Sequence, residues 1–230
     1  MKNFEISLYG HLIHDTIFNG IKIHETVGGL ANVWDALIQL CDHKVHIEPT
    51  EIGEALIYVD PIKSRRASKA SLSLKKRIPF IRNSDWSHIL YLNQLKETGF
   101  ISEVSAKSKF VSADICAGSI LKNVELLEHV DLLFVSDDDL WLPIEELRRV
   151  VKGDILVHHS HGSCFYRKNG DFFETVIEKI LTNVNILGAG DMFAASVISN
   201  LIDGGDGSLK KAIEDSHKKT FNLIKLSNEK

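Results

Sequence analysis

Short apolar runs alternate with amphipathic stretches along almost the whole chain. The runs have the length of strands, whereas the stretches repeat apolar side chains at helical spacing. Expected strands cover residues 4–9, 55–59, 88–92, 110–113, 132–135, 155–157 and 172–175, and expected helices cover residues 30–41, 119–129, 144–151, 191–201 and 208–226. This alternation predicts an α/β fold with a central, mostly parallel sheet and helices on both faces. Ligands of such folds bind beyond the carboxyl ends of the strands.

Composition excludes several other classes of protein. The 230 residues are 44% hydrophobic and 25% charged, which is typical of a globular chain. A net charge of −4 provides no cationic field for nucleic acid. No apolar run approaches the ~20 residues that span a bilayer, and the N-terminus lacks the apolar core of a signal peptide. We therefore expect a soluble, cytoplasmic protein with neither nucleic acid nor membrane as partner.

Cysteine usage and chain organisation are also informative. Cys41, Cys116 and Cys164 are odd in number and show no CxxC spacing, which argues against a disulfide scaffold and for a reducing compartment. We find no internal repeat and no Pro- or Gly-rich linker, so a single domain over residues 1–230 is the better interpretation.

The most informative local motif is Gly188-Ala189-Gly190-Asp191, which is followed at once by an amphipathic stretch. The glycines allow a tight turn and a close approach to a ligand. The free N–H groups at the start of a helix form an anion site suited to a phosphate. Asp191 could accept the proton of a hydroxyl group that attacks this phosphate. The alternative is that Asp191 merely caps the helix.

In its context this motif resembles the signature of the PfkB or ribokinase family of sugar and nucleoside kinases. Residues 188–193 match the second half of the family pattern D-T-x-G-A-G-D-x-F, whereas Asn185 and Ile186 depart from its first half. The resemblance implies that Asp191 is the catalytic base and that the N–H groups of Ala189, Gly190 and Asp191 hold the transferred phosphate. Because position 185 helps to bind a monovalent cation in some members, Asn185 makes cation activation doubtful.

Two further motifs occur in the order expected for this family. Gly10 and Asp15 follow the first expected strand, and the resemblance implies that Asp15 binds sugar hydroxyls from a turn. Gly28, Gly29 and Asn32 open an expected helix and follow the order of the family pattern G-G-x-x-x-N, with two rather than three residues between Gly29 and Asn32; the resemblance implies donors for the substrate. Taken alone, either motif could be a structural turn or a helix cap.

Other family motifs have diverged. Where the family has N-x-x-E near Mg²⁺, this chain has Ser136 and Asp139 within the run Ser-Asp-Asp-Asp. Carboxylates suit Mg²⁺, although a run of aspartates is often only solvated. Where the family has T-L-G-x-x-G at the nucleotide, this chain has His158-His159-Ser160-His161-Gly162, in which only Gly162 aligns. No cysteine pair lies nearby to complete a zinc cluster, so histidines that contact nucleotide or solvent are favoured over a metal site.

The segment from residue 61 to residue 84 carries eight basic residues and no acidic one. The simplest interpretation is a solvated, mobile loop; a loop that closes over an anionic ligand is an alternative, and a nucleic-acid patch is less favoured because aromatic residues are not interleaved. The family has an extra strand–helix unit between residues 29 and 55 that this chain lacks, which predicts a small, reduced lid over about residues 51–84. Relatives often pair through the lid, so a homodimer is expected.

Together the motifs predict a ribokinase-like kinase that uses ATP and Mg²⁺ to phosphorylate a hydroxyl group of a small sugar or sugar derivative. Acceptor-binding residues would be Asp15, Gly28, Gly29 and Asn32; nucleotide and Mg²⁺ would contact Ser136, Asp139, Gly162 and Asn185. The basic segment hints at an acidic or phosphorylated sugar. The main alternative is a sugar- or nucleotide-binding protein on the same scaffold that has lost efficient turnover, and a nucleoside kinase is a closer alternative.

Overall fold

The computed structural model describes residues 3–60, 65–115, 120–177, 181, 184–204 and 208–229; for residues 59–72 it describes at most the backbone. Within these residues, ten strands form one sheet with the order β10-β9-β8-β7-β6-β5-β1-β3-β4, and β2 pairs with β1. The strands are β1 (Glu5–Asn19), β2 (Lys22–Gly29), β3 (Lys44–Asp60), β4 (Arg65–Lys76), β5 (Trp86–Ile89), β6 (Val111–Ile115), β7 (Leu132–Ser136), β8 (Asp154–His159), β9 (Gly162–Tyr166) and β10 (Phe172–Val176).

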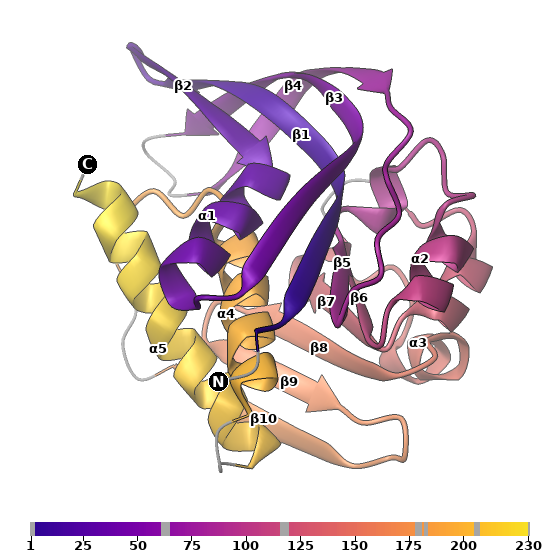
Figure 1. Ribbon diagram of the computed structural model, residues 1–230. Coiled ribbons are helices and arrows are strands. Elements are labelled where there is room, and N and C mark those ends of the chain that lie inside the picture. Colours follow the sequence, from indigo (N-terminus) through magenta and orange to yellow (C-terminus); the bar gives the residue numbers. More distant parts are fainter. Residues whose placement is uncertain are drawn as a thin grey trace.

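The helices cover both faces of this sheet (Figure 1). They are α1 (Leu30–Leu40), α2 (Ile101–Lys107), α3 (Ile144–Val150), α4 (Ala189–Asp203) and α5 (Leu209–Asn228), with short 3-10 turns η1 (Leu92–Gln94), η2 (Val124–His129) and η3 (Asp137–Asp139). Helices α1, α4 and α5 lie on one face, and α2 and α3 lie on the other (Figure 1). The pairs β3–β1, β1–β5, β5–β6, β6–β7 and β7–β8 are all parallel. The predicted α/β fold is confirmed.

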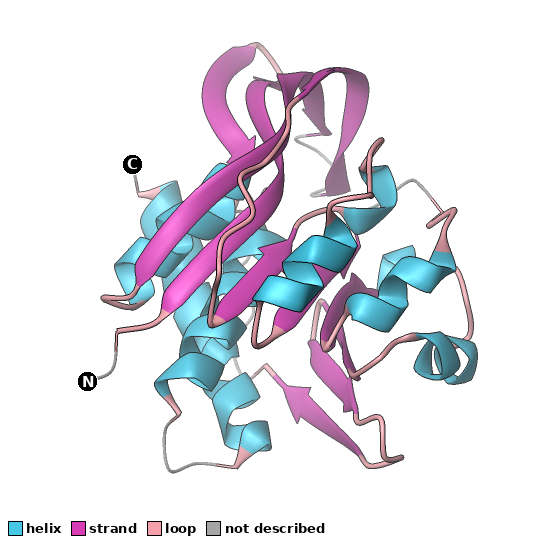
Figure 2. Cartoon of the chain, turned by 45° about the vertical axis from the view of Figure 1, so that its right-hand side comes forward, coloured by secondary structure: helices cyan, strands magenta, loops and turns pink. Residues whose placement is uncertain are grey.

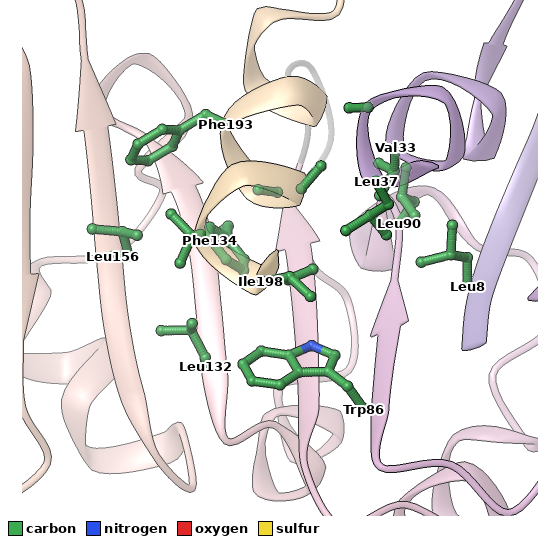
Figure 3. Close-up of a cluster of buried hydrophobic side chains, with 14 of the residues drawn as sticks. Leu8, Val33, Leu37, Trp86, Leu90, Leu132, Phe134, Leu156, Phe193 and Ile198 are labelled. Carbon is green, nitrogen blue, oxygen red and sulfur yellow. The ribbon is translucent and has the colours of Figure 1, made fainter. Parts of the chain in front are cut away.

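Two apolar cores hold the layers together, one on each face of the sheet. The first packs α1, α4 and α5 against the sheet through residues such as Leu37, Phe134 and Ile198, all of which are essentially excluded from solvent (Figure 3). The second packs α2, η2 and α3 against the other face through residues such as Val104 and Leu147. Apolar side chains on successive positions of the central strands serve both cores, which explains their continuous apolar runs.

A second layer of strands curves away from this core (Figure 2). We call it the outer sheet: the half of β1 from His11 onward, β2, the half of β3 from Glu51 onward, and β4. In β1 the residues up to Tyr9 pair with β5, whereas residues 12–19 pair with β2. A register shift between Gly10 and His11 separates the two halves. Both long strands therefore run from the core into the outer sheet without a break.

Several expectations about local structure are wrong. Asp15 lies within β1 rather than in a turn, because β1 continues ten residues past the expected end at residue 9. The basic segment is largely not a loop: residues 65–76 form β4, which pairs antiparallel with β3, while residues 61–64 lie outside the described residues. The expected helix at residues 119–129 is only a 3-10 turn over Val124–His129, and its expected start at 119 lies outside the described part. Strands β2 and β9 and helix α2 were not expected.

The segment expected to form a lid, about residues 51–84, lies partly in the outer sheet. Residues 51–60 and 65–76 pair as its hairpin, but β1 and β2 supply two more strands. Two of its basic residues make ion pairs: Lys76 Nζ lies 2.9 Å from Glu97 Oε1, and Arg82 Nε lies 2.6 Å from Glu48 Oε1. The charged groups of these two side chains are therefore paired with carboxylates of the protein.

Candidate active site

Asp191 lies in the first turn of α4, at the edge of the sheet where the parallel strands have their carboxyl ends. Gly188 precedes the helix with φ 78°, a left-handed conformation that glycine adopts without strain. The first hydrogen bond of the helix runs from Met192 N to Gly188 O at 2.9 Å, so the N–H groups before Met192 have no partner from the helix itself. The turn therefore directs backbone donors toward the loops beyond the sheet.

The Asp191 carboxylate contacts other elements rather than its own helix. Asn32 Nδ2 donates a 2.7 Å hydrogen bond to Asp191 Oδ2, and the Tyr91 hydroxyl donates to Oδ1 at 3.0 Å and to Oδ2 at 3.1 Å. Among the described residues, no backbone N–H group of α4 donates to this carboxylate. The alternative that Asp191 merely caps a helix is therefore not supported by its contacts.

Burial changes the chemistry of this carboxylate. Asp191 is only 4% exposed, and loss of hydration raises its pKa to about 6, although the hydrogen bonds from Asn32 and Tyr91 act in the opposite direction. The negative charge of Asp15 raises the pKa slightly further. A carboxylate with a pKa near 6 is a better proton acceptor at neutral pH than an ordinary aspartate, and it is still mostly ionised there.

Asp15 reaches the same place from β1. It faces the end of β2, because a Cβ atom added to Gly28 would overlap Asp15 Oδ2 and would lie 3.8 Å from Asn32 Nδ2. A glycine at position 28 therefore lets the Asp15 carboxylate keep this place, which a side chain would force it to leave. A Cβ on Gly188 would lie 3.1 Å from the same Asn32 amide. The structure thus brings Asp15, Gly28, Asn32 and the 188–191 turn together, although they come from three separate parts of the sequence.

Gly29 also has a structural reason to be glycine. Its φ of 63° places it in the left-handed region, and a Cβ there would overlap the carbonyl oxygen of His11. Gly29 thus allows β2 to turn into α1 against β1, which positions Asn32 one turn later. The nearest atoms to such a Cβ all belong to His11 of β1, so Gly29 contributes to the site through the packing of the backbone.

The phosphate-binding turn differs from expectation at one residue. Ala189 N donates a 3.0 Å hydrogen bond to Ile186 O, so this group is already engaged. The expectation that Ala189 offers a free donor is wrong for this conformation. The N–H groups of Gly190 and Asp191 have no backbone acceptor in the part of the chain that the structure describes. They are the two donors that remain for an anion at this helix start.

Tyr91 is a site residue that the sequence did not reveal. It was expected inside a strand, but β5 ends at Ile89 and Tyr91 has φ 55° and ψ 49°. It is the one non-glycine residue with positive φ among those described, and such a conformation costs about 1–2 kcal/mol for a bulky residue. The strain aims its hydroxyl at Asp191. The sequence signal that could have indicated Tyr91 was an aromatic residue with a hydroxyl group shortly after a buried parallel strand.

A buried ion pair lies behind Tyr91. The His11 ring stands edge-on to the Tyr91 ring at 6.1 Å, and His11 Nε2 lies 2.9 Å from Glu51 Oε2. Both residues of this pair are excluded from solvent. The pair joins β1 and β3 at the point where both strands enter the outer sheet.

His158 lies on the other side of the 188–191 turn. Its ring would be 3.6 Å from a Cβ placed on Gly190, and it stands edge-on to Phe193 of α4 at 5.8 Å. His158 pairs in the sheet with Ser136, the last residue of β7. Ser136 therefore lies at the carboxyl edge of the sheet, one strand away from the start of α4. Gly162 pairs with His159 in the turn that joins β8 to β9.

The structure does not bring all of the residues expected to contact nucleotide and Mg²⁺ to one place. Asp139 belongs to η3, directly after β7, and contributes a hard oxygen donor that suits Mg²⁺. Asn185 is exposed, its Oδ1 accepts from Leu187 N at 3.0 Å, and its backbone carbonyl accepts from Asn228 Nδ2 of α5 at 2.9 Å. These contacts give Asn185 a place in the loop before α4, but none of them brings it to Asp191. The donor set at Ser136 and Asp139 fits Mg²⁺ by chemistry.

The site is closed in this conformation. Asp15 is 8% exposed and Asp191 is 4% exposed. Two surface cavities, of about 280 Å³ beside Ser84 and about 200 Å³ beside Thr16, are lined by other residues. Both carboxylates are therefore nearly excluded from solvent.

None of the helices described has the length and apolar character needed to cross a membrane. No protein-family model and no curated protein sequence matches this chain significantly.

Solved structures do match the chain. A pyrophosphate-dependent kinase in the ribokinase family, complexed with a pyrophosphate analog and myo-inositol, aligns with a TM-score of 0.70 at 17% identity, over 96% of this chain and 95% of its own. Arabidopsis thaliana ribokinase, complexed with ribose and ATP, aligns with a TM-score of 0.72 at 15% identity, over 97% and 93% of the two chains. A Burkholderia thailandensis nucleoside kinase in complex with inosine aligns with a TM-score of 0.68 at 14% identity, over 96% and 91%. The chain has the ribokinase-like fold, as the sequence motifs predicted.

Proposed function

We propose that this chain is a kinase that transfers a phosphoryl group to a hydroxyl group of a small sugar, polyol or related acceptor. The observation that carries this proposal is the convergence of Asp15, Gly28 and Asn32 on Asp191, beside the free N–H groups that open α4. The site combines a proton acceptor, donors for an anion and a second carboxylate for hydroxyl groups. The structures of sugar and nucleoside kinases that share the fold support the same activity.

In this proposal Asp15 and Asn32 hold the acceptor, and Asp191 removes the proton from its reacting hydroxyl group. The hydroxyl oxygen forms a bond to phosphorus while the bond from phosphorus to the donor oxygen breaks, and the proton moves to the Asp191 carboxylate. The N–H groups of Gly190 and Asp191 stabilise the charge on the transferred group. Closure around the buried carboxylate excludes water, which would otherwise compete as acceptor.

For the donor we propose ATP with Mg²⁺, held by Ser136, Asp139, Gly162 and Asn185. When bound, Mg²⁺ would neutralise phosphate charge. A second donor is favoured by a specific observation: histidines occupy residues 158, 159 and 161, where the family has its nucleotide turn. Pyrophosphate needs no base-binding pocket, and two of the structures that share the fold come from pyrophosphate-dependent kinases.

The test is a donor–acceptor panel with the full-length protein. ATP and pyrophosphate are each combined with sugars, inositols and nucleosides, and phosphorylated product is detected by ³¹P NMR. Asp191→Asn should lower turnover by roughly 10²–10⁴-fold because it removes the proton acceptor. Asp42→Asn, at an exposed aspartate after α1, is the matched control and should retain wild-type turnover.

The panel also separates the alternatives. A protein that binds a sugar or a nucleotide yet forms no product with any pair would be a binding protein on a kinase scaffold. Product from nucleosides but not from sugars would make it a nucleoside kinase. The single domain over residues 1–230, a lid that includes residues 51–84, a homodimer and a cytoplasmic location stay predictions.

A further inference from the structure

Three strands at the edge of the sheet bring His159, Cys164 and Glu174 to one face. Cys164 of β9 pairs directly with Glu174 of β10, so their side chains project from the same face. On its other side Cys164 pairs with Val157 of β8, and His159 lies two residues after Val157. Because side chains alternate along a strand, His159 projects from this face as well.

The ligand atoms of these three residues all lie within 4.8 Å of one another. Bonds to zinc of about 2.0–2.3 Å place neighbouring ligand atoms roughly 3.3–3.8 Å apart in a tetrahedral site. Small side-chain rotations therefore suffice to close the site around an ion. His159 and Cys164 are half-buried and Glu174 is exposed, so the backbone of three paired strands fixes the ligands while solvent can still reach them.

We propose that His159, Cys164 and Glu174 form a zinc site with a fourth position open to water or an external ligand. The donor set of one imidazole, one thiolate and one carboxylate matches the preferences of Zn²⁺ and not those of Mg²⁺ or Ca²⁺, which take oxygen ligands. Sequence spacing could not reveal the site, because Cys164 and Glu174 meet His159 only through the strand register.

This site adjoins the proposed donor site at Gly162, which pairs with His159, but its ligands project from the other face of the sheet from His158. His158 projects from the opposite face of β8 and packs against Phe193. Ser163, which neighbours Cys164 in β9, likewise points away and hydrogen-bonds Thr175 and His217 at 2.8 and 2.9 Å. The inference therefore does not depend on the kinase assignment, and its test needs no substrate.

The groups around the thiol and the imidazole determine what zinc must displace. Burial, followed by the charge of Glu174, raises the pKa of the Cys164 thiol. Zinc binds cysteine as the thiolate, so coordination displaces the thiol proton as the Zn–S bond forms. His159 Nδ1 accepts a long 3.3 Å hydrogen bond from His161 N. Coordination through Nδ1 uses the lone pair that accepts this bond, and coordination through Nε2 leaves the ring proton on Nδ1, so either mode breaks the bond.

The test measures metal binding by the purified, metal-stripped full-length chain. Zinc affinity is determined by competition with a chromogenic chelator in the presence of excess Mg²⁺, and Co²⁺ is used as a spectroscopic probe. We expect stoichiometric zinc binding that Mg²⁺ does not displace, proton release on binding, and a thiolate-to-Co²⁺ charge-transfer band.

Three variants identify the ligands. Mutation of a residue that hydrogen-bonds to a metal ligand typically weakens metal binding by about 10–100-fold. Glu174→Gln and His159→Gln each remove a ligand itself, so each should weaken zinc binding by at least that much. Cys164→Ser should in addition abolish the charge-transfer band. Cys41→Ser, at a half-buried cysteine whose thiol donates to Leu37 O after α1, is the matched control and should behave like the wild type.

The outcomes are decisive in both directions. Cobalt bound without a thiolate band, or zinc affinity unchanged in Cys164→Ser, would overturn the proposal. Because Glu174 is exposed, Glu174→Gln should fold normally by circular dichroism. It therefore tests the site even if Cys164→Ser fails to fold, and unchanged affinity in Glu174→Gln would remove the carboxylate from the proposed site.

Discussion

Asn32 at the start of α1 donates a 2.7 Å hydrogen bond to Asp191 at the start of α4. The two residues are 159 positions apart in the sequence, yet each opens a helix at the same edge of the sheet. A residue proposed to hold the acceptor thus also orients the proposed base. Acceptor binding and proton removal are therefore coupled through one side chain.

Tyr91→Phe should move the acidic limb of the pH–rate profile. The Tyr91 hydroxyl donates to both carboxylate oxygens of Asp191 and thereby lowers its pKa. Without this donor the pKa should rise above about 6, by roughly one unit, so that kcat/KM reaches its plateau at a higher pH. The control is Tyr58→Phe at an exposed tyrosine of the outer sheet, and ¹³C NMR titration of the Asp191 carboxyl group reports the same shift without a substrate. Coincident titrations of wild type and Tyr91→Phe would refute a positioning role.

Asp191→Asn should stabilise the protein near neutral pH. Burial raises the folded-state pKa of Asp191 from 3.8 to about 6, so the folded state binds more protons than the unfolded state between these values. Stability from this group is complete below about pH 4 and is lost as the pH rises through about 6. We expect Asp191→Asn to gain roughly 2–3 kcal/mol at pH 8, measured by chemical denaturation. Equal differences between the two proteins at pH 8 and pH 4 would contradict this origin.

His217→Gln should reduce the loss of stability in mild acid. Burial, with smaller contributions from His158 and His159, lowers the folded-state pKa of His217 from 6.5 to about 4. The neutral ring favours folding above pH 6.5, and this contribution is lost as the pH falls toward 4. After allowance for the partial exposure of the ring, we expect roughly 1–2 kcal/mol. The measurement is the difference in unfolding free energy between pH 7.5 and pH 4.5. A wild type and variant with the same difference would show that His217 does not titrate in this way.

Gly28→Ala should weaken catalysis without unfolding the protein. The new methyl group would overlap Asp15 Oδ2, so the carboxylate must move. Misplacement of a positioning group by about 1 Å can cost 10²-fold in rate, and we expect a loss of that order in kcat/KM. Gly99→Ala is the control, because its added Cβ would meet no atom within 4 Å. Full activity in Gly28→Ala would show that Asp15 does not hold the acceptor.

The sequence predicted those parts of the structure that depend on local pattern. Apolar runs located the central parallel strands, and the Gly-rich motifs located the starts of α1 and α4. The sequence also predicted that Asp191 lies at the start of a helix.

What the sequence did not reveal depends on long-range pairing. Strand β1 extends past Gly10 because β2 and β3 pair with its second half, and no local signal distinguishes such a continuation from a turn. Tyr91 turns toward Asp191 through a strained backbone that propensity does not predict. The N–H group of Ala189 was expected to hold the phosphate, because the sequence could not show that it donates to the carbonyl oxygen of Ile186.

The continuity of β1 and β3 has a consequence for how substrate enters. Asp15 lies on the half of β1 that belongs to the outer sheet, whereas Asp191 is anchored in the core by α4 (Figure 1). No loop separates the halves, so a movement of the outer sheet relative to the core would have to flex the two strands, near the irregularity between Gly10 and His11. Such flexing would separate Asp15, proposed to hold the acceptor, from Asp191, the proposed base, and the acceptor would meet the base only when the two strands returned to the conformation described above.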